Sequence, residues 1–156
     1  MKTETIPMAQ LAELLAVQLE NGEAPLRVTG SSMHPTFRHG RDTVILKKPD
    51  TPLCRGDVIL YLRDNGRYVL HRIVKQKNDL LILSGDNQFE PEEVRPSQVI
   101  ARVVAFRRDG KEYLVTHFGY CLWVWFWVLL FPLRKQLLRL RRWLGKLRRS
   151  YVRGKR

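Results

Sequence analysis

The apolar positions near the amino terminus recur at helical spacing, with polar residues between them. They are Met8, Leu11, Leu14, Leu15 and Leu19. This pattern predicts an amphipathic packing helix over residues 8–20, and Asn21 and Gly22 form a signal that ends it. A DNA-reading helix-turn-helix needs two helices, and this segment has room for one.

Between residues 26 and 116 the pattern changes to short apolar runs separated by turn signals. Asp64-Asn65-Gly66 is a hairpin signal, and Asp109-Gly110 marks a second tight turn. The predicted strands cover residues 44–46, 57–62, 67–75, 80–83, 99–106 and 113–115. Many short strands with turns between them predict a mainly β fold with an antiparallel, partly barrel-like sheet.

A third pattern covers residues 113–133, which are 21 residues without a formal charge when His117 is neutral. As a helix, this stretch would span roughly 31 Å, which is about the thickness of a bilayer core. Residues 121–131 contain three Trp and two Phe, more large aromatic side chains than a small soluble domain readily hides. The stretch therefore predicts a membrane-embedded helix over residues 117–133, and the alternative is a buried core helix.

The positive charge is concentrated after this stretch. The formal net charge is +13, but residues 134–156 contain 11 Lys and Arg and no acidic residue, which leaves 17 basic and 15 acidic residues in the rest. Leucines in this tail recur at spacings of three and four, which predicts a basic amphipathic helix on an anionic membrane surface. The alternative is a helix held on nucleic acid by phosphate contacts. The preceding apolar stretch favours lipid, so no nucleic-acid partner is expected.

The composition makes several other classes of protein unlikely to fit. Cys54 and Cys121 lie far apart in the sequence, so neither a disulfide scaffold nor a cysteine zinc site is expected. His34, His39 and His117 have no carboxylate or cysteine at metal-ligand spacing, so we expect no metal and no cofactor. The amino terminus shows no secretory signal, because polar and charged residues interrupt it.

Residues 28–36 hold the most informative chemistry. Ser31 and Ser32 lie between Gly30 and Pro35, where the backbone bends and a side chain can be presented. Alone, this segment is typical of an ordinary turn with locally bonded hydroxyls. A serine hydroxyl is a poor nucleophile at neutral pH, so a catalytic role also requires a base within hydrogen-bond reach.

Four blocks of the chain, in order, resemble the motifs of the type I signal peptidases and their relatives, which include mitochondrial inner-membrane peptidases and self-cleaving SOS-type repressors. The Gly-x-Ser-Met-x-Pro-Thr segment at residues 30–36 resembles the nucleophile motif. The later blocks are Arg-Gly-Asp-Val-Ile at residues 55–59, Tyr-Val-Leu-His-Arg-Ile-Val at 68–74 and Ser-Gly-Asp-Asn at 84–87. The resemblance covers about residues 26–107 and implies a signal-peptidase-like antiparallel β catalytic domain.

The resemblance implies that Ser32 is the nucleophile and that the block at residues 68–74 supplies its base. That block contains His71 and Arg72, and an arginine cannot give up its proton in a protein. An imidazole has an ordinary pKa of ~6.5 and acts as a base without extreme burial. A histidine base resembles the archaeal, sporulating-bacterial and endoplasmic-reticulum branch of the family. On a strand, His71 shares a face with Lys75, which is the alternative base.

The expected third catalytic residue is Asp86, which would orient His71 and stabilise its cation. The chain departs here from the histidine branch, which usually has a further Asp a few residues after the Gly-Asp-Asn motif. Glu90 and Glu92 lie at that place, so either of them is an alternative or additional partner.

The expected oxyanion hole uses the backbone N–H of Ser32. Many signal peptidases add a hydroxyl two residues earlier, but that position is Gly30 in this chain. Ser31 is therefore a second candidate donor, and Met33 and Pro35 are expected to line the substrate site.

The predicted organisation is a peptidase domain over residues 1–116, a hydrophobic membrane segment over 117–133 and the basic tail over 134–156. The resemblance implies a membrane-associated serine endopeptidase that cleaves signal or leader peptides from precursor proteins, which it binds as extended strands. If the segment spans, the basic tail places the catalytic domain on the extracytoplasmic side. The alternative is that residues 118–133 enter one leaflet and the catalytic domain faces the cytoplasm.

Three other functions are open at this point. A catalytically degenerate peptidase fold would bind membrane or peptide without cleaving it. An autoproteolytic repressor relative would need space for a DNA-binding domain and would use Lys rather than His as its base. A nucleic-acid binder would depend on the basic tail.

Overall fold

The computed structural model describes residues 8–133 and residue 136. Helix α1 (Met8–Glu20) forms where the apolar spacing predicted it, and the chain leaves the helix at Asn21 and Gly22. Leu15 and Leu19 on this helix are buried in the core. The predicted packing helix is therefore confirmed, and it leads directly into the sheet.

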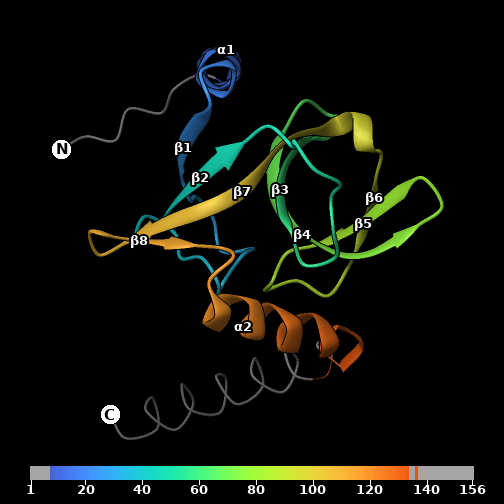
Figure 1. The fold of residues 1–156 in the computed structure, drawn as a ribbon. Helices are drawn as coiled ribbons and strands as arrows, with labels where there is room; N and C mark the ends of the chain where they lie inside the picture. Colours follow the sequence, from blue (N-terminus) through green and yellow to red (C-terminus); the bar gives the residue numbers. More distant parts are fainter. Residues whose placement is uncertain (1–7, 134–135, 137–156) are drawn as a thin grey trace, which may run out of the picture.

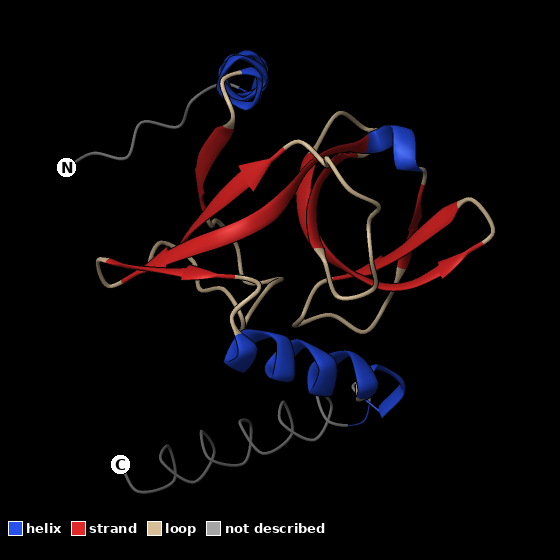
Figure 2. Ribbon diagram, in the orientation of Figure 1, coloured by secondary structure: helices blue, strands red, loops and turns tan. Residues whose placement is uncertain are grey.

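Eight strands of the described chain form one antiparallel sheet that curls on itself (Figures 1 and 2). The order along the sheet is β1-β2-β7-β3-β4-β5-β6, and β8 pairs with β7. The predicted mainly β antiparallel fold is confirmed, although β1 and β6 were not predicted because they are short and partly polar. The strands are β1 (Glu23–Arg27), β2 (Thr43–Lys47), β3 (Val58–Leu62), β4 (Tyr68–Lys77), β5 (Leu80–Ser84), β6 (Glu92–Val94), β7 (Val99–Arg108) and β8 (Lys111–Leu114).

The sheet encloses two hydrophobic clusters, which share strand β3. Val58 and Leu60 belong to the larger cluster with α1, whereas Ile59 and Tyr61 belong to the smaller one. This division follows from the strand period, because successive side chains point to opposite faces. Strand β7 pairs with both β2 and β3 and so joins the two halves. The smaller cluster also contains Ile73, Leu81, Leu83 and Val94.

Residues 117–133, which were predicted to form a membrane-embedded helix, contain a shorter helix. Helix α2 (Phe118–Leu129) has 12 residues, which is about 18 Å of helix, and it lies across one end of the curled sheet (Figure 1). The uncharged stretch is divided because its first residues pair with β7 in β8 and because His117 caps α2. The predicted helix was therefore too long.

A search of the described residues finds no helix that is both long and apolar enough to cross a bilayer. The basic amphipathic helix predicted over residues 134–156 lies outside the described residues, apart from residue 136.

Candidate active site

The loop after β1 presents Ser32. Gly30 has a φ of 80°, a left-handed conformation that glycine adopts without strain, and its N–H donates to Nδ1 of His39 over 3.0 Å. On the other side of Ser32, Met33 and Phe37 are buried in the larger cluster. These two anchors hold the loop against the sheet and leave Ser32 half-buried between them.

The Gly-Asp-Asn segment lies directly against Ser32. The N–H of Asn87 donates to the carbonyl oxygen of Ser32 over 2.7 Å. A Cβ added at Gly85 would lie 2.7 Å from that same carbonyl oxygen, so only glycine allows this approach. Ser84, the residue before Gly85, pairs with Arg72 across β5 and β4. Ser32 is thereby placed beside the part of the sheet that carries His71.

His71 is a buried side chain, 2% exposed, whose ring is held through one nitrogen. Its Nδ1 lies 2.8 Å from Oε1 of Glu92 and 3.1 Å from the hydroxyl of Tyr61. Because an ionised carboxylate only accepts hydrogen bonds, Nδ1 carries the proton and donates to Glu92. Nε2 of the neutral ring then has a free lone pair, which is the form that a general base requires.

Glu92 is itself held by two neighbours on and after β3. Arg63 donates from Nε to Oε2 and from Nη2 to Oε1, each over 2.8 Å, and the Tyr61 hydroxyl donates to Oε1. Burial raises the pKa of Glu92, but the bonds from Arg63 and Tyr61 lower it more, so its pKa lies below the ordinary value. The carboxylate is therefore ionised whenever His71 needs a negative partner.

Burial is also the largest influence on His71. It lowers the pKa of the imidazole more than the charge and hydrogen bond of Glu92 raise it, and the charge of Arg63 lowers it further. The net pKa lies below the ordinary 6.5. His71 is thus neutral, and able to accept a proton, across the neutral pH range.

Asp86 has a different partner from the one expected. Arg72 donates to both of its carboxylate oxygens, over 2.9 and 2.8 Å, and Thr36 donates to Oδ2. Both Arg72 and Asp86 are 0% exposed. His71 and Arg72 are neighbours on a strand, so their side chains point to opposite faces, and Asp86 lies on the face of Arg72. The expected contact between Asp86 and the imidazole is therefore corrected: Glu92, the alternative in the sequence, makes it.

The structure brings Ser32 and His71 to the same region, but no hydrogen bond joins their side chains within the described residues. Hydrogen bonds of this kind are often long before substrate binds. Lys75, the alternative base, is exposed beyond a bulge that shifts the register between Ile73 and Lys75. Its position on the sheet does not place it with the groups around His71.

The other expected site residues have mixed placements. Ser31 is exposed, and its carbonyl oxygen accepts from the N–H of His34. Met33 lies in the core rather than along a substrate surface. Pro35 lines a cavity of about 290 Å³ together with Thr36 and the first turns of α2.

Two residues of the site, Tyr61 and Arg63, were missed by the sequence analysis. Ile59 pairs with His71 across β3 and β4, so Tyr61, two residues further along β3, lies on the same face as the imidazole. The alternation within β3 was the signal that could have found Tyr61. Arg63 lies in the turn beyond the strand, where no pattern marked it.

A comparison with protein families adds independent support for this site. Residues 6–104 match the model of the Peptidase S24-like family. The chain belongs to this family. The family covers signal peptidase I and the SOS-repressor type of peptidase, so the recognised resemblance is confirmed and the domain is a serine peptidase fold. A comparison with curated proteins gives no match.

The S24-like region ends before α2, yet α2 is bonded to the centre of the candidate site. Nε1 of Trp123 donates to the hydroxyl of Thr36 over 3.1 Å, and Nη1 of Arg72 lies 3.4 Å from the hydroxyl of Tyr120. A Cβ at Gly56 would lie 2.9 Å from the Val124 side chain, so the Arg-Gly-Asp turn also packs closely on the helix. Helix α2 is therefore part of the framework of this peptidase domain.

The structure predicts how the pH profile responds to loss of the Glu92 carboxylate. The Glu92→Gln variant is expected to lower kcat/KM by about 10²- to 10⁴-fold and to move the acid limb of kcat/KM to lower pH. The sign follows because Glu92 raises the pKa of His71 whereas Arg63 lowers it. Without the carboxylate, the buried ring loses its proton at a lower pH than in the wild type. The measurement is kcat/KM against pH, which reports the free enzyme.

The matched control is Glu90→Gln, because Glu90 is an exposed carboxylate two residues away. It is expected to leave both the rate and the acid limb unchanged. An acid limb that moves to higher pH in Glu92→Gln would contradict the assignment, and so would a Glu90→Gln variant with the larger defect.

Proposed function

We propose that this S24-like peptidase is a serine endopeptidase that removes signal or leader peptides from precursor proteins. Ser32 is the nucleophile, His71 is the general base and Glu92, rather than Asp86, is the third member of the triad. The observation that carries the proposal is the 2.8 Å contact between Nδ1 of His71 and Glu92. It leaves Nε2 for a proton from Ser32, whose loop is bonded to the segment beside the histidine strand.

In the proposed reaction, Oγ of Ser32 attacks the scissile carbonyl carbon while Nε2 of His71 accepts the hydroxyl proton. The Ser32 backbone N–H donates no hydrogen bond within the described chain, so it is available to the developing oxyanion. His71 then returns the proton to the leaving amine. Water, activated by the same Nε2, hydrolyses the acyl-enzyme and restores Ser32. Glu92 stabilises the imidazolium that forms in each half.

An open strand edge next to His71 suits an extended substrate. Residues 68–72 of β4 pair with β3, but β5 pairs with β4 only from Arg72 onward. The second edge of Tyr68–His71 is therefore not paired with any described strand. A substrate segment that adds to this edge by backbone hydrogen bonds would carry its scissile bond to the end of that edge, where His71 lies.

A purified full-length enzyme and a precursor that carries a leader peptide test the proposal. We expect two fragments with masses that fix one internal cleavage site, and no fragments with the Ser32→Ala variant. Ser97→Ala is the matched control, because Ser97 is an exposed serine in the short 3-10 helix at residues 96–98. Intact precursor with the wild-type enzyme, or equal cleavage by Ser32→Ala, would instead support a degenerate peptidase fold that binds without cleaving.

A lipid membrane is the second proposed partner, because leader peptides are commonly presented to their peptidases there. An extracytoplasmic position for the catalytic domain stays a prediction.

A further inference from the structure

The outward face of α2 is a continuous apolar surface. Phe118 is 78% exposed, Trp125 is 64% exposed and Leu122 is 54% exposed, although each is a large hydrophobic side chain. Together with three further exposed residues they recur at helical spacing, which places them along one side of the helix. The set, which we call the outer face, is Phe118, Leu122, Trp125, Phe126, Leu129 and Leu133.

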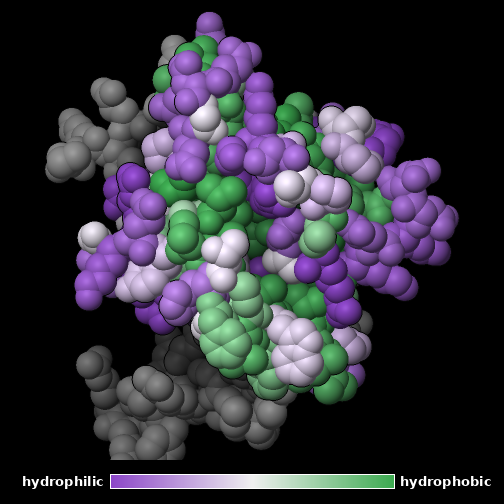
Figure 3. All heavy atoms as spheres, in the orientation of Figure 1, coloured by the Kyte–Doolittle hydropathy of each residue, from purple (hydrophilic) through white to green (hydrophobic). Residues whose placement is uncertain are grey.

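The outer face is extended by the neighbouring strand. Tyr113 and Leu114 of β8 are exposed just before α2 begins. In the space-filling view, green and pale side chains gather at the lower edge of the molecule, whereas purple polar side chains cover most of the remaining surface (Figure 3). Residues 113–133 contain no Asp, Glu, Lys or Arg, so no charged group interrupts this surface.

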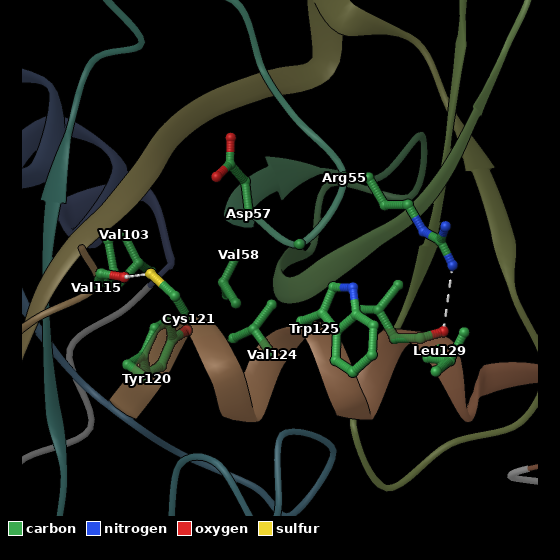
Figure 4. A pocket seen from close by; sticks show the side chains of 12 residues that line it. Arg55, Asp57, Val58, Val103, Val115, Tyr120, Cys121, Val124, Trp125 and Leu129 are labelled. Atoms are coloured by element: carbon green, nitrogen blue, oxygen red, sulfur yellow. Dashed lines mark hydrogen bonds between the residues drawn. The ribbon is translucent and has the colours of Figure 1, made fainter. Parts of the chain in front are cut away.

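The opposite face of α2 is fixed to the peptidase domain. Val124 and Val128 point toward the sheet, and Nη2 of Arg55 donates to the carbonyl oxygen of Val128 over 3.3 Å (Figure 4). Trp123 and Tyr120 add the bonds to Thr36 and Arg72 described above. The helix therefore cannot turn its outer face inward without breaking contacts to the candidate active site.

The charge of the following chain identifies the surface that the outer face fits. Residues 134–156 carry 11 Lys and Arg and no acid, and they follow α2 directly in the sequence. A helix with exposed Trp, Phe and Leu beside a cationic segment is typical of binding in the plane of an anionic bilayer. Protein interfaces, in contrast, combine an apolar centre with a polar rim of mixed charge.

We propose that the outer face of α2 is a monotopic membrane-docking surface, which inserts its side chains into one leaflet of an anionic bilayer. This deepens the proposed function by naming the surface through which the enzyme meets the membrane. Because the inner face of α2 is bonded to Thr36 and Arg72, docking holds the active site at a fixed distance and orientation from the lipid headgroups.

Vesicle sedimentation with the full-length Ser32→Ala protein tests the surface without depending on catalysis. The probes are vesicles of phosphatidylcholine alone and vesicles with 30% phosphatidylglycerol, a composition of about the charge found on cytoplasmic leaflets. We expect strong binding to the anionic vesicles and weak binding to the neutral ones. Adding Leu122→Glu is expected to weaken binding to anionic vesicles by at least about tenfold, because a charge replaces an inserted leucine.

The matched control is Leu14→Glu, since Leu14 is a helix leucine of similar exposure, 49%, on α1, which lies at the other end of the molecule (Figure 1). It is expected to bind as the parent does. Equal binding of Leu122→Glu and the parent would overturn the proposal, because the charged tail alone would then explain lipid attraction. A dimer in the absence of lipid that Leu122→Glu converts to a monomer would also overturn it, because a second copy would then cover the outer face.

Discussion

Replacing either Ser32 or His71 by alanine is expected to lower kcat/KM for a leader-peptide precursor by about 10⁴- to 10⁶-fold. The effect is this large because the hydroxyl and the imidazole act in one step, in which Oγ attacks while Nε2 takes its proton. The double variant should be no slower than either single variant, since removal of one partner leaves the other without a role. Steady-state kinetics with the purified proteins, over a wide range of enzyme concentration, measure all three.

Two measurements separate this result from loss of folding or from another base. Each variant should have a thermal melting temperature close to that of the wild type at neutral pH, because the expected defect is chemical. Lys75→Met is the matched test of the alternative base, and we expect it to retain the wild-type rate because Lys75 is exposed beyond the β4 bulge. A Lys75→Met variant as slow as Ser32→Ala, with His71→Ala active, would exclude the histidine mechanism.

Much of the fold follows from local patterns. The spacing of leucines gave α1, and the Asp-Asn-Gly and Asp-Gly signals gave the turns before β4 and β8 because each supplies a residue with positive φ. The order of the four family blocks also placed Ser32 and His71 in one region. These features depend on residues that are close together in the sequence or on a motif whose members are fixed relative to one another.

The partners of charged side chains were harder to predict, because they depend on which face each strand presents. Asp86 and Glu92 are six residues apart, and either one reaches the histidine strand. The buried Arg72 takes Asp86, so that Glu92 remains for His71. The helix at residues 117–133 failed for a related reason. An uncharged run predicts a membrane helix only if its residues are free, and Tyr113 and Leu114 are already paired with β7.

The second large effect concerns stability rather than chemistry. Asp86→Ala is expected to lower the free energy of unfolding by about 3–5 kcal/mol, because it leaves the guanidinium of Arg72 buried without its counter-charge. The coupling is wide, since Arg72 also donates to the carbonyl oxygen of Gly56 and Thr36 bonds both Asp86 and Trp123. Urea denaturation followed by circular dichroism measures the change. The exposed pair Arg95 and Asp64 is the matched control, and Asp64→Ala should cost at most about 1 kcal/mol.

The same residue distinguishes a structural ion pair from a catalytic triad. Replacing both partners, as Arg72→Met with Asp86→Leu, should recover part of the lost stability, because no unpaired charge stays buried. In the more conservative Asp86→Asn variant, the acid limb of kcat/KM should move less than in Glu92→Gln, since Asp86 acts on His71 only through space whereas Glu92 bonds its Nδ1. If Asp86→Asn shifted the limb as far as Glu92→Gln while unfolding like the wild type, Asp86 would be the orienting carboxylate. The 2.8 Å contact with Glu92 would then be incidental.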